Sequence, residues 1–231
     1  MTIPTDRKNM PFNVKDCTLI TRMAGVETAL NLRELRERLR TCPLESLFHH
    51  FCETVIRPTF DDPEFRNDFA IWATRDLQDR VLAERLGILN PYTFKNLEEL
   101  RQVAIDIIDD RLAEVPYVPW VKQGNDFCFM RAVTVIFDTG IQLHQPEDLV
   151  NAIPELSLSS IYYHYVEARR RTKKGVDDFT AWLYDFGKGT RPLIKALGSI
   201  DFYFMHLHEL QAHLERAVAP FREEAPVEKS A

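Results

Sequence analysis

The feature of this sequence that most limits its possible folds is an internal duplication. The segment LESLFHHF, which begins at Leu44, aligns with LSSIYYHY, which begins at Leu158. Further matches follow in the same order along the chain, among them NDFAIW from Asn67 with DDFTAW from Asp177. Matches that keep one order over a whole chain indicate a structural unit that is present twice. We therefore predict two tandem repeats of similar structure.

The repeats cover residues 12–112 and 127–220. An N-terminal segment (1–11), a connector (113–126) and a polar C-terminal tail (221–231) complete the chain. Two prolines and a glycine in the connector favour a non-helical backbone. Its residues Tyr117, Val118 and Trp120 predict that the connector packs on a protein surface.

Each repeat opens with a strand-like run of residues, Phe12–Thr21 in the first and Phe127–Phe137 in the second. A turn at Gly25 or Gly140 follows, and this order predicts a β-hairpin at the start of each repeat. Because a short hairpin alone is only marginally stable, we expect the opening strands to pair in one small shared antiparallel sheet.

Apolar residues at helical spacing predict about four to five helices after each hairpin. In the first repeat these include Leu32–Leu39 with Asn31 as its N-cap, Leu44–Ile56 ending at Pro58, a helix through Trp72, and Leu97–Leu112. In the second repeat they include Leu158–Arg170 ending at the loop Lys173–Gly175, a helix through Trp182, and Leu207–Phe221. The predicted fold is a predominantly α-helical α+β protein whose repeats are related by a pseudo-twofold axis. The alternative is two separate lobes joined by the connector.

Polar residues at matched positions of the two repeats form the candidate site. They are His50, Glu53 and Asp68 in the first repeat and His164, Glu167 and Asp178 in the second. In each repeat the histidine and the glutamate lie three residues apart, so a helix places both on one face. Three interpretations stay open: each histidine is buried against its aspartate and supports the fold, the six side chains hold a metal ion, or they bind another ligand.

A run of basic residues follows the second candidate histidine: Arg169, Arg170, Arg171, Lys173 and Lys174. Cations are stabilised at the C-terminus of a helix, and this is the simpler interpretation of the run. The alternative is a contact with an anionic ligand or partner.

The net charge of −6 argues against a protein that binds nucleic acid over its whole surface. No stretch approaches 18 consecutive apolar residues, and the first residues lack the apolar stretch of an export signal. The four cysteines form no CxxC pair. These observations predict a cytoplasmic protein with reduced thiols and no membrane contact.

The sequence contains no GxSxG, HExxH or GxxxxGK[ST] motif. We therefore expect a non-catalytic interaction protein, an adaptor or a regulator, that has protein partners and needs no cofactor. The alternative is a protein that binds a small molecule or a metal ion, or an enzyme, with a polar His/Asp/Glu pocket between the repeats. The oligomeric state does not follow from the sequence.

The blocks PFNVKDCTLI, RPTFDDPEFRNDFAIWA and LSSIYYHYVEARRRT resemble an uncharacterised bacterial family known only as a domain of unknown function. Each half is also similar to short prokaryotic domains with a His-His … Asn-Asp-Phe-x-x-Trp pattern. Here that pattern falls on His49, His50, Asn67, Asp68, Phe69 and Trp72. In the second half Tyr163 replaces the first histidine and Asp177 replaces the asparagine, so a site that needs both histidines would be asymmetric. The resemblance implies no activity.

Overall fold

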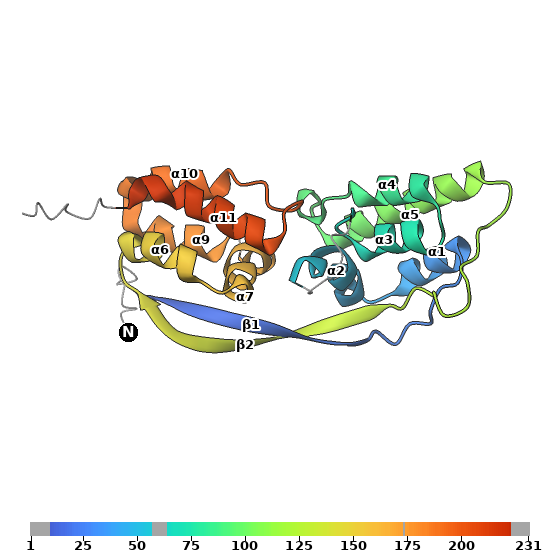
Figure 1. Ribbon diagram of the computed structural model, residues 1–231, viewed down its shortest axis with the longest axis horizontal. Helices are drawn as coiled ribbons and strands as arrows, with labels where there is room; N and C mark the ends of the chain where they lie inside the picture. The colour runs from blue at the N-terminus through green and yellow to red at the C-terminus, as the bar shows by residue number, and fades with distance from the viewer. Residues whose placement is uncertain (1–9, 57–63, 173, 223–231) are drawn as a thin grey trace, which may run out of the picture. The chain divides into compact units, whose positions relative to one another are not determined.

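A computed structural model describes residues 10–56, 64–172 and 174–222. The described chain is mostly α-helical and has one two-stranded antiparallel sheet, which confirms the predicted α+β class (Figure 1). The chain forms two compact units. Unit 1 combines residues 1–18 with 135–231, and unit 2 consists of residues 19–134.

The sheet pairs strand β1 (Phe12–Met23) with strand β2 (Met130–Leu143). Each strand crosses the unit boundary, so each contributes residues to both units. The pairing is antiparallel: the Lys15 ammonium lies 2.6 Å from the Asp138 carboxylate near one end, and near the other the Ala24 amide donates to the Phe129 carbonyl at 2.8 Å. The expected sheet shared by the two opening strands is therefore confirmed.

The predicted hairpins are wrong, because within the described residues each half contributes one long strand. Gly25 and Gly140 do have the left-handed backbone expected of turn residues, with φ of 79° at each. Gly140 nevertheless lies inside β2. Its amide donates to an Asp138 carboxylate oxygen at 3.1 Å, and the Ile141 amide donates to the Thr139 hydroxyl at 3.2 Å. These local hydrogen bonds satisfy the distorted backbone, so the strand continues instead of reversing.

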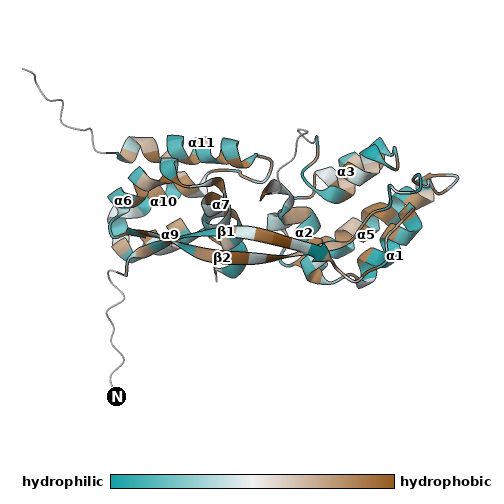
Figure 2. Ribbon diagram, turned by 60° about the horizontal axis from the view of Figure 1, so that its bottom comes forward, coloured by the Kyte–Doolittle hydropathy of each residue, from teal (hydrophilic) through white to brown (hydrophobic). Residues whose placement is uncertain are grey.

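The helices of unit 2 agree closely with the predicted ones. They are α1 (Leu32–Thr41), α2 (Leu44–Cys52), α3 (Asp68–Arg75), α4 (Arg80–Gly87) and α5 (Leu97–Glu114). Asn31 caps α1 as predicted, because its side-chain oxygen accepts the Glu34 amide at 3.0 Å. The helical turn Thr54–Ile56 follows α2, and the predicted stop at Pro58 lies outside the described residues. Figure 2 shows hydrophobic and hydrophilic residues mixed along α1 and α5, as in amphipathic helices.

The helices of unit 1 are shorter. They are α6 (Pro146–Ala152), α7 (Leu158–Ile161), α8 (Ala168–Arg171), α9 (Asp178–Leu183), α10 (Arg191–Gly198) and α11 (Leu207–Val218). A π-helical segment, Tyr162–Glu167, joins α7 to α8, so the predicted helix Leu158–Arg170 is continuous but locally widened. Lys173 and the tail after Arg222 lie outside the described residues.

Each core takes aromatic residues from a strand-like run that the sequence assigns to the other half. Phe127 and Phe129 are buried in the core of unit 2, among residues of α1 to α5. In unit 1, Phe12 packs against the rings of Phe179 and Trp182. The compact units therefore differ from the two predicted repeats, because the first part of each strand-like run lies in the unit that holds the helices of the other half.

The connector lies against unit 2 along its backbone. The Val121 amide donates to the Leu30 carbonyl at 2.9 Å, and Trp120 forms an isolated antiparallel bridge with Asn31. Val118 packs against the core of unit 2, as predicted. The side chains of Tyr117 and Trp120 instead remain exposed.

No helix in the described ranges combines the length and the hydrophobicity that crossing a membrane requires.

Candidate functional site

The first candidate histidine, His50 on α2, uses both of its ring nitrogens in hydrogen bonds within unit 2. Nδ1 lies 2.6 Å from a carboxylate oxygen of Asp68, the first residue of α3. Nε2 lies 2.9 Å from the Met130 amide nitrogen at the start of β2. An amide N–H can only donate, so Nε2 is the acceptor and Nδ1 carries the proton that is donated to Asp68. This geometry describes a neutral imidazole with a defined tautomer.

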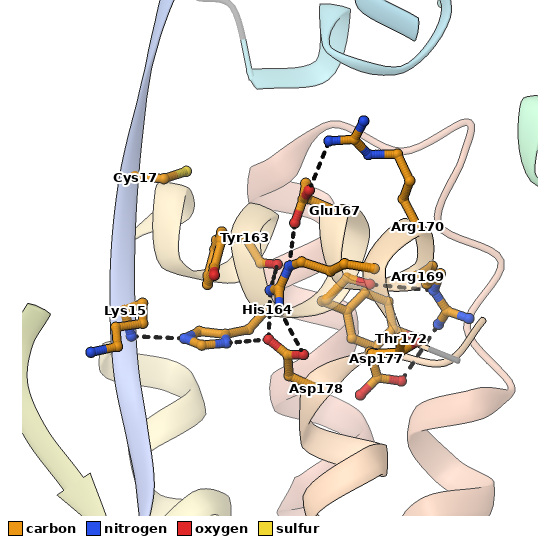
Figure 3. A network of polar contacts seen from close by, with 12 residues as sticks. Lys15, Cys17, Tyr163, His164, Glu167, Arg169, Arg170, Thr172, Asp177 and Asp178 are labelled. Carbon is orange, nitrogen blue, oxygen red and sulfur yellow. Dashed lines mark hydrogen bonds and ion pairs between the residues drawn. The ribbon is translucent and has the colours of Figure 1, made fainter. Parts of the chain in front are cut away.

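The second candidate histidine, His164, repeats this geometry inside unit 1. It lies in the π-helical segment, and its Nδ1 is 2.7 Å from a carboxylate oxygen of Asp178 (Figure 3). The Lys15 amide of β1 donates to its Nε2 at 2.8 Å. The same donor argument assigns the proton of His164 to Nδ1.

Aromatic rings enclose both imidazoles. Phe127 lies 4.8 Å from His50 between ring centroids, and Phe12 lies 4.8 Å from His164. The side chains of His50 and His164 are both buried. Each histidine therefore connects three elements of one unit: its own helix, the helix that begins with the aspartate, and a strand.

The six candidate residues divide between the two units. His50 and Asp68 lie in unit 2, and His164 and Asp178 lie in unit 1. Glu53 instead pairs with His49 at 2.6 Å, and both of these side chains are buried. No group of three or more His, Cys, Asp or Glu side chains placed to hold a metal ion occurs among the described residues.

Glu167, the counterpart of Glu53, pairs with arginines. Arg171 donates from Nε to Glu167 and from its terminal nitrogen to Asp178 at 2.6 Å, and its guanidinium lies 3.9 Å from the ring centroid of Tyr163. Burial alone would lower the pKa of Arg171, but the hydrogen bonds to Asp178 and Glu167 outweigh this cost and raise its pKa. A Tyr–Arg stack therefore stands in unit 1 where unit 2 has the His49–Glu53 pair.

The other described members of the basic run are also engaged within the chain. Arg169 lies 3.6 Å from Asp177 and stacks on Phe202, with 4.7 Å between the guanidinium carbon and the ring centroid. Arg170 lies 3.3 Å from Glu167, and the ammonium of Lys174 lies 4.5 Å from the centroid of the Tyr184 ring. These contacts favour a structural role for the run; Lys173 is outside the described residues.

Sequence reasoning missed the two strand amides that complete these networks. A signal was present, because Met130 follows Phe127 at the same spacing as Lys15 follows Phe12. This signal could not be used from the sequence alone, because each amide comes from the half of the chain opposite to that of its histidine.

Comparisons with known proteins add a family and a fold. Residues 9–219 match a family described as a family of unknown function (DUF5752). The chain is also similar to a solved structure described as the structure of OrfY from Thermoproteus tenax. The two are 25% identical with a TM-score of 0.75, and the match covers 93% of this chain and 97% of that one. No match is found among the curated proteins.

Proposed function

The chain belongs to this family of unknown function, and we propose that it is a non-catalytic interaction protein, an adaptor or a regulator of other proteins. One observation carries the proposal: the polar residues shared by the two halves are occupied in holding the fold. Both ring nitrogens of His50 and of His164 have partners within the chain, and the two residues are only 2% and 3% exposed. A general base needs a free ring nitrogen within reach of its substrate.

The proposal includes an internal duplication, with the two copies in a pseudo-twofold arrangement. Its support is a set of equivalent contacts at equivalent positions. The indole of Trp72 donates to the carbonyl of Asn125 at 2.7 Å, and the indole of Trp182 donates to that of Met10 at 3.1 Å. Asn125 and Met10 stand at the same distance before Met130 and Lys15, whose amides bind the two histidines. A duplicated adaptor would present two related surfaces to its partners.

A cytoplasmic location and a bacterial origin belong to the same proposal and rest on the sequence alone. The alternative, an enzyme or a ligand-binding protein with a His/Asp/Glu pocket, has less support. To bind a substrate or ligand, the imidazoles would have to break the hydrogen bonds that they accept from the strand amides of Met130 and Lys15.

The proposal is tested by isolating the tagged protein from its native host after brief chemical cross-linking. We expect one protein to co-purify in a stoichiometric ratio, and purified samples of the two proteins to form the same complex again. The same preparation is examined by native mass spectrometry. A stoichiometric small molecule or metal ion, in the absence of any protein partner, would overturn the adaptor proposal in favour of the alternative.

A further inference from the structure

Unit 2 contains a groove beside the connector that none of the contacts described above occupies. Its cavity volume is about 680 Å³. The lining comes from the segment Leu77–Val81 at the start of α4, from Arg111 and Val115 at the end of α5, and from the connector residues Pro116, Tyr117, Pro119 and Trp120.

Two aromatic side chains of this groove are open to solvent although the connector backbone is held in place. Tyr117 is 76% exposed and Trp120 is 65% exposed. Val81, which also lines the groove, is 42% exposed. Tyr and Trp are enriched among the interface residues that contribute most to binding energy. Their exposure beside this groove therefore marks it as a candidate binding surface.

The charged groups of the groove are already neutralised by ion pairs. Arg111 lies 2.8 Å from Asp79 and 3.1 Å from Glu114, and the hydrogen bond that Arg111 donates to Asp79 is the main cause that raises the pKa of Arg111. Arg80 lies 2.8 Å from Glu64 and 3.1 Å from Glu84. A charged ligand would have to compete with these pairs, so the lining favours an uncharged one.

The groove also offers hydrogen-bond donors. The indole N–H of Trp120, the side-chain amide of Gln78 and the hydroxyl of Tyr117 have no hydrogen-bond partner within the described ranges. The carbonyl groups of an uncharged ligand would complement these donors, and the side-chain carbonyl of Gln78 and the hydroxyl of Tyr117 can also accept.

We propose that this groove binds an extended, uncharged, proline-containing segment of a partner protein. The inference rests on the proposed adaptor function and assigns one surface to it. Proline rings pack on aromatic faces, and a polyproline II segment is already extended, so it loses little entropy on binding. Proline has no N–H, and the carbonyls of such a segment have no internal partners. They can therefore accept from Trp120 and Gln78.

The experiment measures binding of fluorescein-labelled decaproline to the full chain by fluorescence anisotropy, with a Gly/Ser peptide of equal length as the control ligand. We expect saturable binding of decaproline alone, nearly independent of salt because no ion pair forms. Trp120→Ala should weaken it by about tenfold or more. Trp120→Phe, which keeps a ring but loses the indole donor, should weaken it less. Phe204→Ala removes a 49% exposed aromatic residue from unit 1 and should leave binding unchanged.

Decaproline that fails to saturate the protein, or that binds Trp120→Ala as tightly as the unmodified chain, would overturn the inference. So would light scattering that shows a dimer dispersed by Trp120→Ala, because the occupant would then be a second copy of the chain. Thermal unfolding at an unchanged temperature confirms that Trp120→Ala still folds. If the native partner binds Trp120→Ala normally, the groove assignment fails while the adaptor function stands.

Discussion

At the scale of single residues, the two histidines act as hydrogen-bonding junctions with a defined tautomer. Each imidazole donates from Nδ1 to an aspartate and accepts at Nε2 from a strand amide. A buried polar group that loses its partner costs about 1–3 kcal/mol. The side chains of His50 and His164 should therefore each stabilise the unit that contains them.

We predict that His50→Ala lowers the stability of unit 2 by about 1–3 kcal/mol, because the Met130 amide loses its acceptor and Asp68 loses one hydrogen bond. Hydrogen exchange followed by NMR checks this at single amides: the Met130 amide should exchange about tenfold faster for each 1.4 kcal/mol lost. The Lys15 amide, which binds His164, is the internal control and should be unaffected.

The reciprocal change, His164→Ala, should make the Lys15 amide exchange faster and leave the exchange rate of the Met130 amide unchanged. The double substitution of His50→Ala with Asp68→Ala should lower the stability by less than the sum of the two single substitutions. Each single substitution already removes the same His50–Asp68 hydrogen bond. Undiminished protection of Met130 in His50→Ala would show that the imidazole does not hold β2.

At the scale of elements, the helices followed from the sequence more directly than the strands did. Caps such as Asn31 act on amides three residues away, so the start of α1 could be read locally. The length of the two strands could not be predicted locally, because a glycine with positive φ is compatible both with a hairpin turn and with a position inside a long strand, as at Gly140. The His–Asp pairs were predictable from matched positions in the sequence. The pairing of Glu53 with His49 instead depends on packing.

Two matched glycines, the last residues of α4 and α10, should respond oppositely to the same substitution. A Cβ added to Gly87 would overlap the ring of Phe65, whereas a Cβ on Gly198 meets nothing within 4 Å. We predict that Gly87→Ala destabilises by about 1–3 kcal/mol through overpacking. Gly198→Ala should stabilise by about 0.5–1 kcal/mol, because alanine loses less backbone entropy in a helix.

Urea unfolding of both variants measures these changes. A loss of stability in Gly198→Ala that matched the loss in Gly87→Ala would contradict the role given to Phe65. The comparison also separates backbone effects from packing effects, since each glycine is the last residue of a helix of eight residues.

At the scale of the whole molecule, the division of each strand between the two units decides which piece of chain can fold alone. Fragment 19–134 contains the whole of unit 2, including Phe127 and Phe129, which are 5% and 0% exposed. Fragment 12–112, the first predicted repeat, lacks both phenylalanines and the Met130 amide that binds His50. Burial of one phenylalanine side chain contributes about 1.5–3 kcal/mol, and a small domain is stable by only about 5–15 kcal/mol.

We therefore predict that fragment 19–134 unfolds cooperatively in urea and gives a dispersed amide NMR spectrum, whereas fragment 12–112 does neither. Fragment 19–134 carrying Phe129→Ala is the graded control: it should fold with a stability lower by about 3–5 kcal/mol, because the ring leaves a cavity in the core. The opposite result, cooperative folding of 12–112 but not of 19–134, would mean that each sequence repeat folds with its own opening strand. The helices of unit 2 would then fold without Phe127 and Phe129, and the contacts of these two rings would form only afterwards.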